Sequence, residues 1–248
     1  MSLCKHCISG VRHEGTPAGK FEEVGGIRTY VATPTVDYPK DKVLLYLTDI
    51  FGPDLLNHQL LADDFAINGF KVYVPDLFNG DACPADSLEP GSSFDLMAWI
   101  GKHGADTTAP IFDAVIGALK TQGITRIGTT GYCYGGRGCF DLAIANRTNV
   151  TVVAHPSLLR VPEDLEAYEA KSQAPLLINS CQIDSQFPIT AQEIADKLLT
   201  GFGPGYKRTY SAGCTHGFAV RGDLSDPVVK AGKENVFKAT VEFLIEHL

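Results

Sequence analysis

The stretch TTGYCYGGRGC (residues 129–139) decides the fold, because it joins a predicted strand directly to a predicted helix. The letters ITRIG before it predict a buried strand, and the letters CFDLAIAN at its end and beyond it have helical spacing. Gly131, Gly135 and Gly136 surround Cys133. Small residues at these places allow a tight strand-to-helix turn with Cys133 at its tip.

This turn has the pattern of a nucleophile elbow in which sulfur replaces oxygen. The positive end of the following helix points at the sulfur and favours the nucleophilic thiolate. Two other interpretations are a buried structural cysteine beside a glycine-rich turn and a dinucleotide-binding loop. The second lacks a GxGxxG pattern and lies halfway along the chain rather than in its first unit. We therefore predict that Cys133 is a nucleophile.

Outward from the elbow, strand patterns alternate with helical patterns along the chain. Strand patterns occupy residues 26–34, 42–50, 71–78, 124–133, 150–156, 174–184 and 206–213, and helical patterns occupy 56–70, 106–123, 136–146, 189–199 and 227–248. Residues 79–104 are rich in Pro, Gly and Asp and predict a large loop region. This alternation predicts an α/β fold, with a mostly parallel central sheet covered by helices on both faces. In such sheets the functional site lies beyond the carboxyl ends of the strands.

Partners for Cys133 occur in the chain order that an elbow enzyme requires, which is nucleophile, acid and then histidine. Asp184 follows one predicted strand and His216 follows the next. Alone, an aspartate after a strand is commonly a helix cap, and a histidine beside glycine is commonly structural. Together they predict a triad in which Asp184 orients His216 and His216 exchanges a proton with the thiol of Cys133.

Three further residues are candidates for substrate contact or for a pocket wall. His155 follows a predicted strand and is a rival base or substrate contact, although a histidine packed beneath a loop would have the same sequence position. Trp99, with Phe94, follows the loop region and could form a pocket wall, or it could pack in the core or lid.

Five stretches, LTDIFGP, VYVPDLF, GYCYGGRG, CQIDSQFP and GCTHGFAVRGD, resemble in order and spacing the dienelactone hydrolase (carboxymethylenebutenolidase) family. The resemblance covers nearly the whole chain after about residue 25 and implies the α/β-hydrolase fold. It also implies a Cys-Asp-His triad at Cys133, Asp184 and His216. The backbone N–H groups of Ile50 and Tyr134 are implied as the oxyanion hole, and the elbow geometry asks for the same two donors.

This sequence differs from the bacterial members of that family mainly at positions that bind the substrate, and less at positions that carry out the reaction. Asp49 stands where those enzymes carry a glutamate that holds the resting thiol. Asn79 and Gly80 occupy the place of one carboxylate-binding arginine, and Arg221 is displaced by one residue from the place of the other. The sequence is closer to the fungal-type branch, which carries a cysteine-bearing arm before the domain. We expect a hydrolase of small esters, such as lactones or enol lactones, that needs no cofactor.

Composition limits the partners and the compartment. The chain has 248 residues, of which 44% are apolar, and a net charge of −8. We expect one domain over residues 1–248, with residues 1–25 as its arm. The acidic balance argues against nucleic acid and anionic membranes, and no apolar stretch approaches the roughly 20 residues of a membrane span. We expect a cytoplasmic monomer or homodimer whose partner is a small ester.

Seven cysteines are an odd number spread along a long chain, which is unlike a secreted disulfide framework. Cys4 and Cys7 form a CxxC near His6 and His13. Structural zinc sites usually need a second ligand pair further along, and none follows, so we expect no metal. Two other functions stay open at this point. One is a thiol-based redox protein in which Cys4 or Cys7 resolves an oxidised Cys133, and the other is a non-catalytic binding protein on a hydrolase scaffold.

Overall fold

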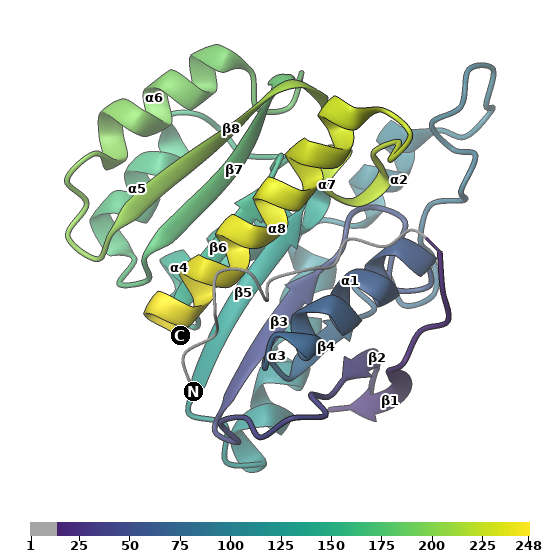
Figure 1. Ribbon diagram of the computed structural model, residues 1–248, viewed down its shortest axis with the longest axis vertical. Coiled ribbons are helices and arrows are strands. Elements are labelled where there is room, and N and C mark those ends of the chain that lie inside the picture. Colours follow the sequence, from purple (N-terminus) through teal and green to yellow (C-terminus); the bar gives the residue numbers. More distant parts are fainter. Residues whose placement is uncertain (1–13) are drawn as a thin grey trace.

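The protein is seen in a computed structural model that describes residues 14–248, built around an eight-stranded sheet (Figure 1). The strand order is β1-β2-β4-β3-β5-β6-β7-β8. All neighbours from β4 to β8 run parallel, whereas β2 is antiparallel to both β1 and β4. The strands are β1 (Lys20–Val24), β2 (Ile27–Ala32), β3 (Lys42–Leu47), β4 (Val72–Pro75), β5 (Arg126–Tyr132), β6 (Val150–Ala154), β7 (Leu176–Ile183) and β8 (Tyr206–Thr215). The predicted mostly parallel sheet is confirmed.

Helices cover both faces of the sheet, as the sequence predicts. The helices are α1 (Leu56–Ile67), α2 (Leu96–Lys102), α3 (Ala105–Thr121), α4 (Tyr134–Ile144), α5 (Glu163–Lys171), α6 (Ile189–Leu199), α7 (Phe218–Arg221) and α8 (Pro227–His247). Apolar residues of α1, α7 and α8 form one core cluster with the sheet, and those of α3, α4, α5 and α6 form the other. Figure 1 shows α1 and α8 together on the near face.

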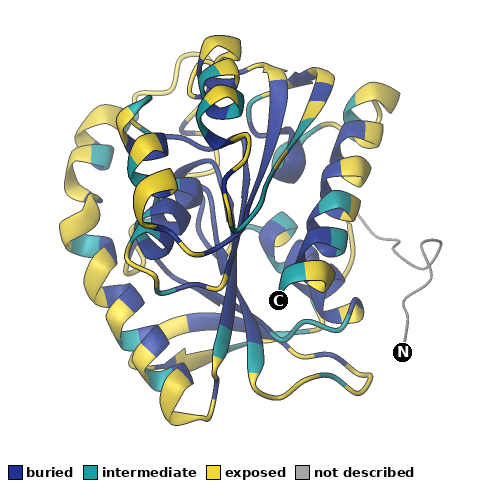
Figure 2. Ribbon diagram, turned by 90° about the vertical axis from the view of Figure 1, so that its left-hand side faces the viewer, coloured by how far each residue is buried: buried dark blue, intermediate teal, exposed yellow. Residues whose placement is uncertain are grey.

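The apolar run of β3 explains how one strand supplies two cores. Val43, Leu45 and Leu47 pack in the cluster with α3 and α4, while Leu44 and Tyr46 pack in the cluster with α1 and α8. Successive side chains of a strand point to opposite faces, so a strand buried on both sides must be apolar throughout. Figure 2 shows the strands as a buried layer between helices whose outer faces are exposed.

Four short elements have no counterpart among the predicted segments. Strand β1 lies within the stretch assigned to the N-terminal arm and joins β2 through Gly25 and Gly26, whose positive φ angles suit a tight hairpin. Helix α2 lies in the expected loop region, where Asp95 caps it by accepting from the N–H of Ala98. The sequence patterns did not predict helices α5 and α7, because α5 is mostly polar and α7 spans a single turn.

The parallel strands bring the predicted site residues to one edge of the sheet. Strands β3, β5, β6, β7 and β8 are each followed within two residues by one of them. In strand order these are Asp49, Cys133, His155, Asp184 and His216. Because all five strands point the same way, these residues gather where the carboxyl ends meet.

Candidate active site

Cys133 occupies a sharp, strained turn between β5 and α4. Its backbone has φ 51° and ψ −112°, a left-handed conformation that non-glycine residues rarely adopt. A Cβ on Gly131 would lie 2.5 Å from the carbonyl oxygen of Gly135, and one on Gly135 would overlap the carbonyl oxygen of Leu47. The glycines are therefore required by close backbone approach, as an elbow demands.

His216 and Asp184 are hydrogen-bonded at the ends of the neighbouring strands β8 and β7. The Nδ1 atom of His216 lies 2.9 Å from Oδ1 of Asp184. Backbone N–H groups of Gln186 and Phe187 donate to the same carboxylate oxygen. Burial alone would raise the pKa of Asp184, but these bonds and the neighbouring imidazole lower it. The carboxylate is thus ionised and accepts the proton on Nδ1.

Ser157 contacts both the thiol and the imidazole, and the sequence analysis did not single it out. Its Oγ lies 3.3 Å from Sγ of Cys133 and 3.4 Å from Nε2 of His216. Burial alone would lower the pKa of His216, but Asp184 and Cys133 raise it to about 9. The imidazole can therefore carry a proton opposite the thiol. The only sequence signal for Ser157 was its place two residues after His155, beyond the end of β6.

The buried Asp49 pairs with the half-buried Arg221. The carboxylate of Asp49 accepts from Nε of Arg221 at 3.0 Å, pairs with Nε2 of His58 at 2.7 Å, and accepts from the N–H of Phe51 at 3.0 Å. Burial alone would raise the pKa of Asp49, but His58 and Arg221 lower it to about 2. The other ring nitrogen of His58 meets the hydroxyl of Tyr46 at 2.6 Å. Asp49 and Arg221 thus bind each other.

The loop after β3 and the first turn of α4 supply two backbone donors. Within the described chain, the N–H groups of Ile50 and Tyr134 donate to no protein acceptor. A Cβ built on Gly135 would lie 2.7 Å from the carbonyl oxygen of Thr48, so the two segments that carry these donors are in close contact. The carbonyl of Ile50 accepts from the backbone N–H of Cys83, which fixes the loop from its other side. Free N–H groups in such a place can stabilise a developing oxyanion.

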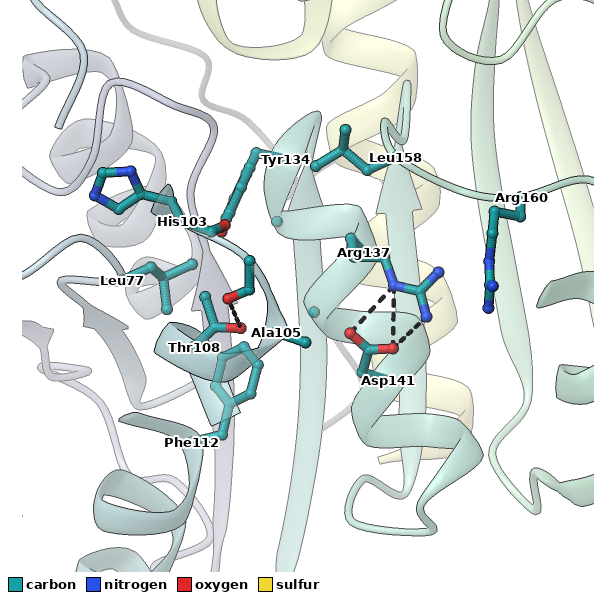
Figure 3. Close-up of a pocket in the computed structure, with 13 residues that line it drawn as sticks. Leu77, His103, Ala105, Thr108, Phe112, Tyr134, Arg137, Asp141, Leu158 and Arg160 are labelled. Atoms are coloured by element: carbon teal, nitrogen blue, oxygen red, sulfur yellow. Dashed lines mark hydrogen bonds and ion pairs between the residues drawn. The ribbon is translucent and has the colours of Figure 1, made fainter. Parts of the chain in front are cut away.

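A cavity of about 270 Å³ opens beside the elbow (Figure 3). Tyr134 and Gly135, the two residues after Cys133, form part of its wall, while Cys133 and His216 do not line it. Arg137 faces it from α4 and is paired with Asp141, as Figure 3 shows. The lining residues are Leu77, His103, Gly104, Ala105, Thr108, Phe112, Tyr134, Gly135, Arg137, Gly138, Asp141, Leu158 and Arg160.

Trp99 and His155 are both placed in packed surroundings. The indole N–H of Trp99 donates to the carbonyl of Asp81 at 2.7 Å, and its ring stacks on His103, behind Tyr134 rather than on the cavity. His155 is fully buried with its ring centre 4.9 Å from that of His216. Burial, with the charge of His216, lowers the pKa of His155 to about 3, so its ring is neutral.

The five cysteines of the described chain are free thiols. Burial raises the pKa of Cys83, Cys139 and Cys181 to about 12, which makes these thiols poor nucleophiles. Cys4 and Cys7 lie outside residues 14–248. Among the residues that are described, no group of three or more His, Cys, Asp or Glu side chains could hold a metal ion, and no helix could cross a membrane.

Comparison with known proteins places the chain in a family. Residues 27–248 match the model of the dienelactone hydrolase family. The hydrolase pyvD of Aspergillus violaceofuscus is 36% identical over 247 residues, covering 98% of this chain and 96% of that protein. Dienlactone hydrolase 1 of Gibberella moniliformis is 30% identical over 248 residues, covering 98% and 92%.

Solved structures agree on the fold. A dienelactone hydrolase-like promiscuous phosphotriesterase from metagenomic libraries superimposes with a TM-score of 0.65 at 16% identity, covering 93% of this chain and 99% of that one. The fold is therefore the α/β-hydrolase fold. The chain belongs to the dienelactone hydrolase family, and this membership makes it a hydrolase of esters.

Proposed function

We propose that the protein hydrolyses small esters, including lactones or enol lactones, by acyl transfer to Cys133. The observation that carries the proposal is the connected line of Cys133, Ser157, His216 and Asp184 at the elbow. A binding protein on the same scaffold would have no need of a strained turn at Cys133 or of an imidazole held by a buried carboxylate.

The reaction begins with attack of the Cys133 thiolate on the carbonyl carbon of the ester. A C–S bond forms, and the carbonyl oxygen becomes an oxyanion that accepts from the N–H groups of Ile50 and Tyr134. Collapse of this intermediate breaks the C–O bond, and His216 gives its proton to the departing alkoxide. A thioester remains on Cys133.

Water completes the turnover. His216, now neutral, takes a proton from water, and the resulting hydroxide attacks the thioester carbon. The acid leaves as the C–S bond breaks, and the thiolate and imidazolium are restored. Asp184 holds His216 in one orientation through both steps and stabilises its charged form. This cycle consumes only ester and water.

We propose that the substrate does not need a carboxylate. Arg221 already pairs with Asp49 through Nε, and Asn79 and Gly80 stand where a second arginine would be needed for a clamp. A bidentate arginine fork depends on fixed geometry, so an arginine bound elsewhere is a weak substitute. We expect neutral esters and lactones to react at rates comparable to those of carboxylate-bearing ones.

The test is hydrolysis of p-nitrophenyl acetate, a γ-lactone and cis- and trans-dienelactone by the wild type, Cys133→Ala and His216→Ala. A matched control is Cys139→Ala, which removes a buried thiol from α4, the helix that follows Cys133. Turnover that survives in Cys139→Ala and disappears in the other two supports the proposal. Acid quenching during p-nitrophenyl acetate turnover should leave an acetyl group on the Cys133 peptide, detected by mass spectrometry.

Two other results would contradict the proposal. If no panel member is hydrolysed while Cys133 is rapidly oxidised by peroxide, the hydrolytic role of Cys133 is wrong, and redox chemistry explains the reactive thiol. If Cys133→Ala keeps its turnover, another residue is the nucleophile.

A further inference from the structure

We propose that Ser157 is a fourth catalytic residue, whose hydroxyl relays the proton between the thiol of Cys133 and the imidazole of His216. This inference rests on the proposed function, because it assigns a role within the same reaction. Ser157 is buried, and its Oγ lies within 3.4 Å of both reacting partners. A serine hydroxyl can donate one hydrogen bond while it accepts another, which is what a relay between two groups requires.

The direction of the proton relay follows from the contact that Nδ1 of His216 makes with Asp184. Because the carboxylate of Asp184 can only accept, Nδ1 of His216 carries a proton, and Nε2 is the nitrogen that faces Ser157. In neutral His216, Nε2 accepts from the Ser157 hydroxyl. In protonated His216, Nε2 donates to Ser157 Oγ, and the hydroxyl then donates to the thiolate.

The proton transfer balances without any other reactant. The O–H proton of Ser157 passes to Nε2 of His216 as the S–H proton of Cys133 passes to Oγ of Ser157. Ser157 ends as a hydroxyl again, Cys133 as a thiolate and His216 as an imidazolium. The reverse transfer restores the neutral pair.

The turn that carries Ser157 is fixed against the elbow. The N–H of Ser157 donates to the carbonyl of Cys133 at 2.9 Å, and a Cβ on Gly136 would lie 2.7 Å from Cβ of Pro156. His155 and Leu158, on either side, have φ 37° and 63°. Left-handed conformations at two non-glycine residues in one short turn are costly and persist only where surrounding contacts fix them. These contacts hold the Ser157 hydroxyl at the thiol.

The neighbouring His155 does not compete for this role. Its two ring nitrogens have no hydrogen-bond partner within residues 14–248, and the ring meets His216 edge to face at 4.9 Å between centres. Burial keeps it neutral, so it packs beside His216 without drawing the proton away. Ser157, unlike His155, therefore has a hydrogen-bonding group within reach of both the thiol and the imidazole.

The experiment measures the thiol directly, without a substrate. Alkylation of Cys133 by iodoacetamide is followed from pH 5 to 10 by peptide mass spectrometry in the wild type, Ser157→Ala, Ser157→Gly and Ser157→Thr. The control is Ser172→Ala, a buried serine at the end of α5 whose hydroxyl oxygen accepts from the backbone N–H of Ala174. Values of kcat and KM for p-nitrophenyl acetate accompany each variant.

Loss of one charge-assisted hydrogen bond should make alkylation at neutral pH about tenfold slower in Ser157→Ala and Ser157→Gly and move its midpoint to higher pH. The same variants should lose about tenfold in kcat with KM unchanged, because the relay acts on the chemistry rather than on binding. Ser157→Thr keeps the hydroxyl and should restore most of both, and Ser172→Ala should match the wild type.

Two outcomes separate this inference from the proposed function. The relay is overturned if folded variants without the hydroxyl keep the wild-type midpoint of Cys133 alkylation and a kcat within twofold of the wild type. Catalysis by Cys133 would still stand in that case. If Cys133 in the wild type is alkylated no faster than the buried thiols, the proposed function itself is overturned. Ser157→Ala and Ser157→Gly both remove the hydroxyl but differ in backbone freedom. The test therefore remains decisive if one of them does not fold.

Discussion

His216 and Asp184 meet at 2.9 Å between Nδ1 and Oδ1, across the ends of two neighbouring parallel strands. The carboxylate is itself held by two backbone N–H groups of the loop that follows it. The orientation of the imidazole is therefore set by the backbone of one loop and the register of β7 with β8, not by His216 alone.

The first prediction concerns the charge of Asp184. Asp184→Asn keeps the shape of the side chain but lets its amide donate to Nδ1, which favours the wrong tautomer of His216. We expect kcat/KM for p-nitrophenyl acetate to fall roughly 1000-fold or more with little change in the circular dichroism spectrum. Asp196→Asn, which alters a peripheral pair with Arg208, is the control and should keep wild-type activity. An equal effect in both variants would mean that Asp184 acts only through stability.

The second prediction is the alkaline limit of activity. Asp184 and Cys133 raise the pKa of His216 to about 9 against the opposing effect of burial, so the imidazolium is lost above that pH. We expect kcat/KM to decline above about pH 9, because the leaving alkoxide then lacks its proton donor. In Asp184→Asn this limit should move to lower pH. A wild-type limit near the ordinary histidine value of about 6.5 would contradict the prediction.

The same group links pH to stability. Because the folded pKa of His216 lies above its ordinary value, the protonated ring stabilises the fold below about pH 6.5, and this contribution disappears as the pH rises through about 9. Urea unfolding of the wild type and of His216→Gln between pH 6 and 10 measures it. The difference in free energy of unfolding between the two proteins should shrink as the pH rises.

The third prediction concerns the buried pair of Asp49 and His58, which the half-buried Arg221 also contacts. Asp49→Asn removes the charge that satisfies both partners, and breaking a buried pair costs about 3 kcal/mol in free energy of unfolding. Activity should fall as well, since Asp49 directly precedes Ile50. Asp54→Asn is the matched control, because the pair of Asp54 with Arg28 is exposed and should contribute less than about 1 kcal/mol. Similar losses in the two variants, measured by urea unfolding, would sink the prediction.

The fourth prediction compares two helical glycines. Gly135→Ala places a Cβ against the carbonyl oxygen of Leu47 and should cost about 2 kcal/mol or more, together with most of the activity. Gly117→Ala, in α3, meets nothing within 4 Å and should raise the free energy of unfolding by about 1 kcal/mol, because alanine favours the helix. Thermal unfolding distinguishes the opposite signs. A stable, active Gly135→Ala protein would show that the elbow tolerates a side chain.

Prediction from sequence worked best where local pattern and burial agree. Strands β3 to β7 and the long helices α3, α6 and α8 follow from apolar periodicity, since each buries one or both faces in a core. The short elements β1, α2, α5 and α7 did not follow. Their conformation depends on a hairpin turn, a single cap or contacts with distant segments, and the local letters carry little of that information.

The sequence by itself determined the tight turn at Cys133, since Gly131, Gly135 and Gly136 allow the close backbone approach that the turn requires. Chain order predicted Asp184 and His216 as partners of Cys133. Only the tertiary structure decided which other polar groups meet them. The β6 loop brings Ser157 to the thiol, and α1 brings His58 to Asp49, which binds Arg221. These partners lie 9 to 172 residues apart in the chain. These contacts depend on the strand order and on the packing of helices on the sheet, which bring together residues that are far apart in the chain. A local sequence pattern holds no information about them.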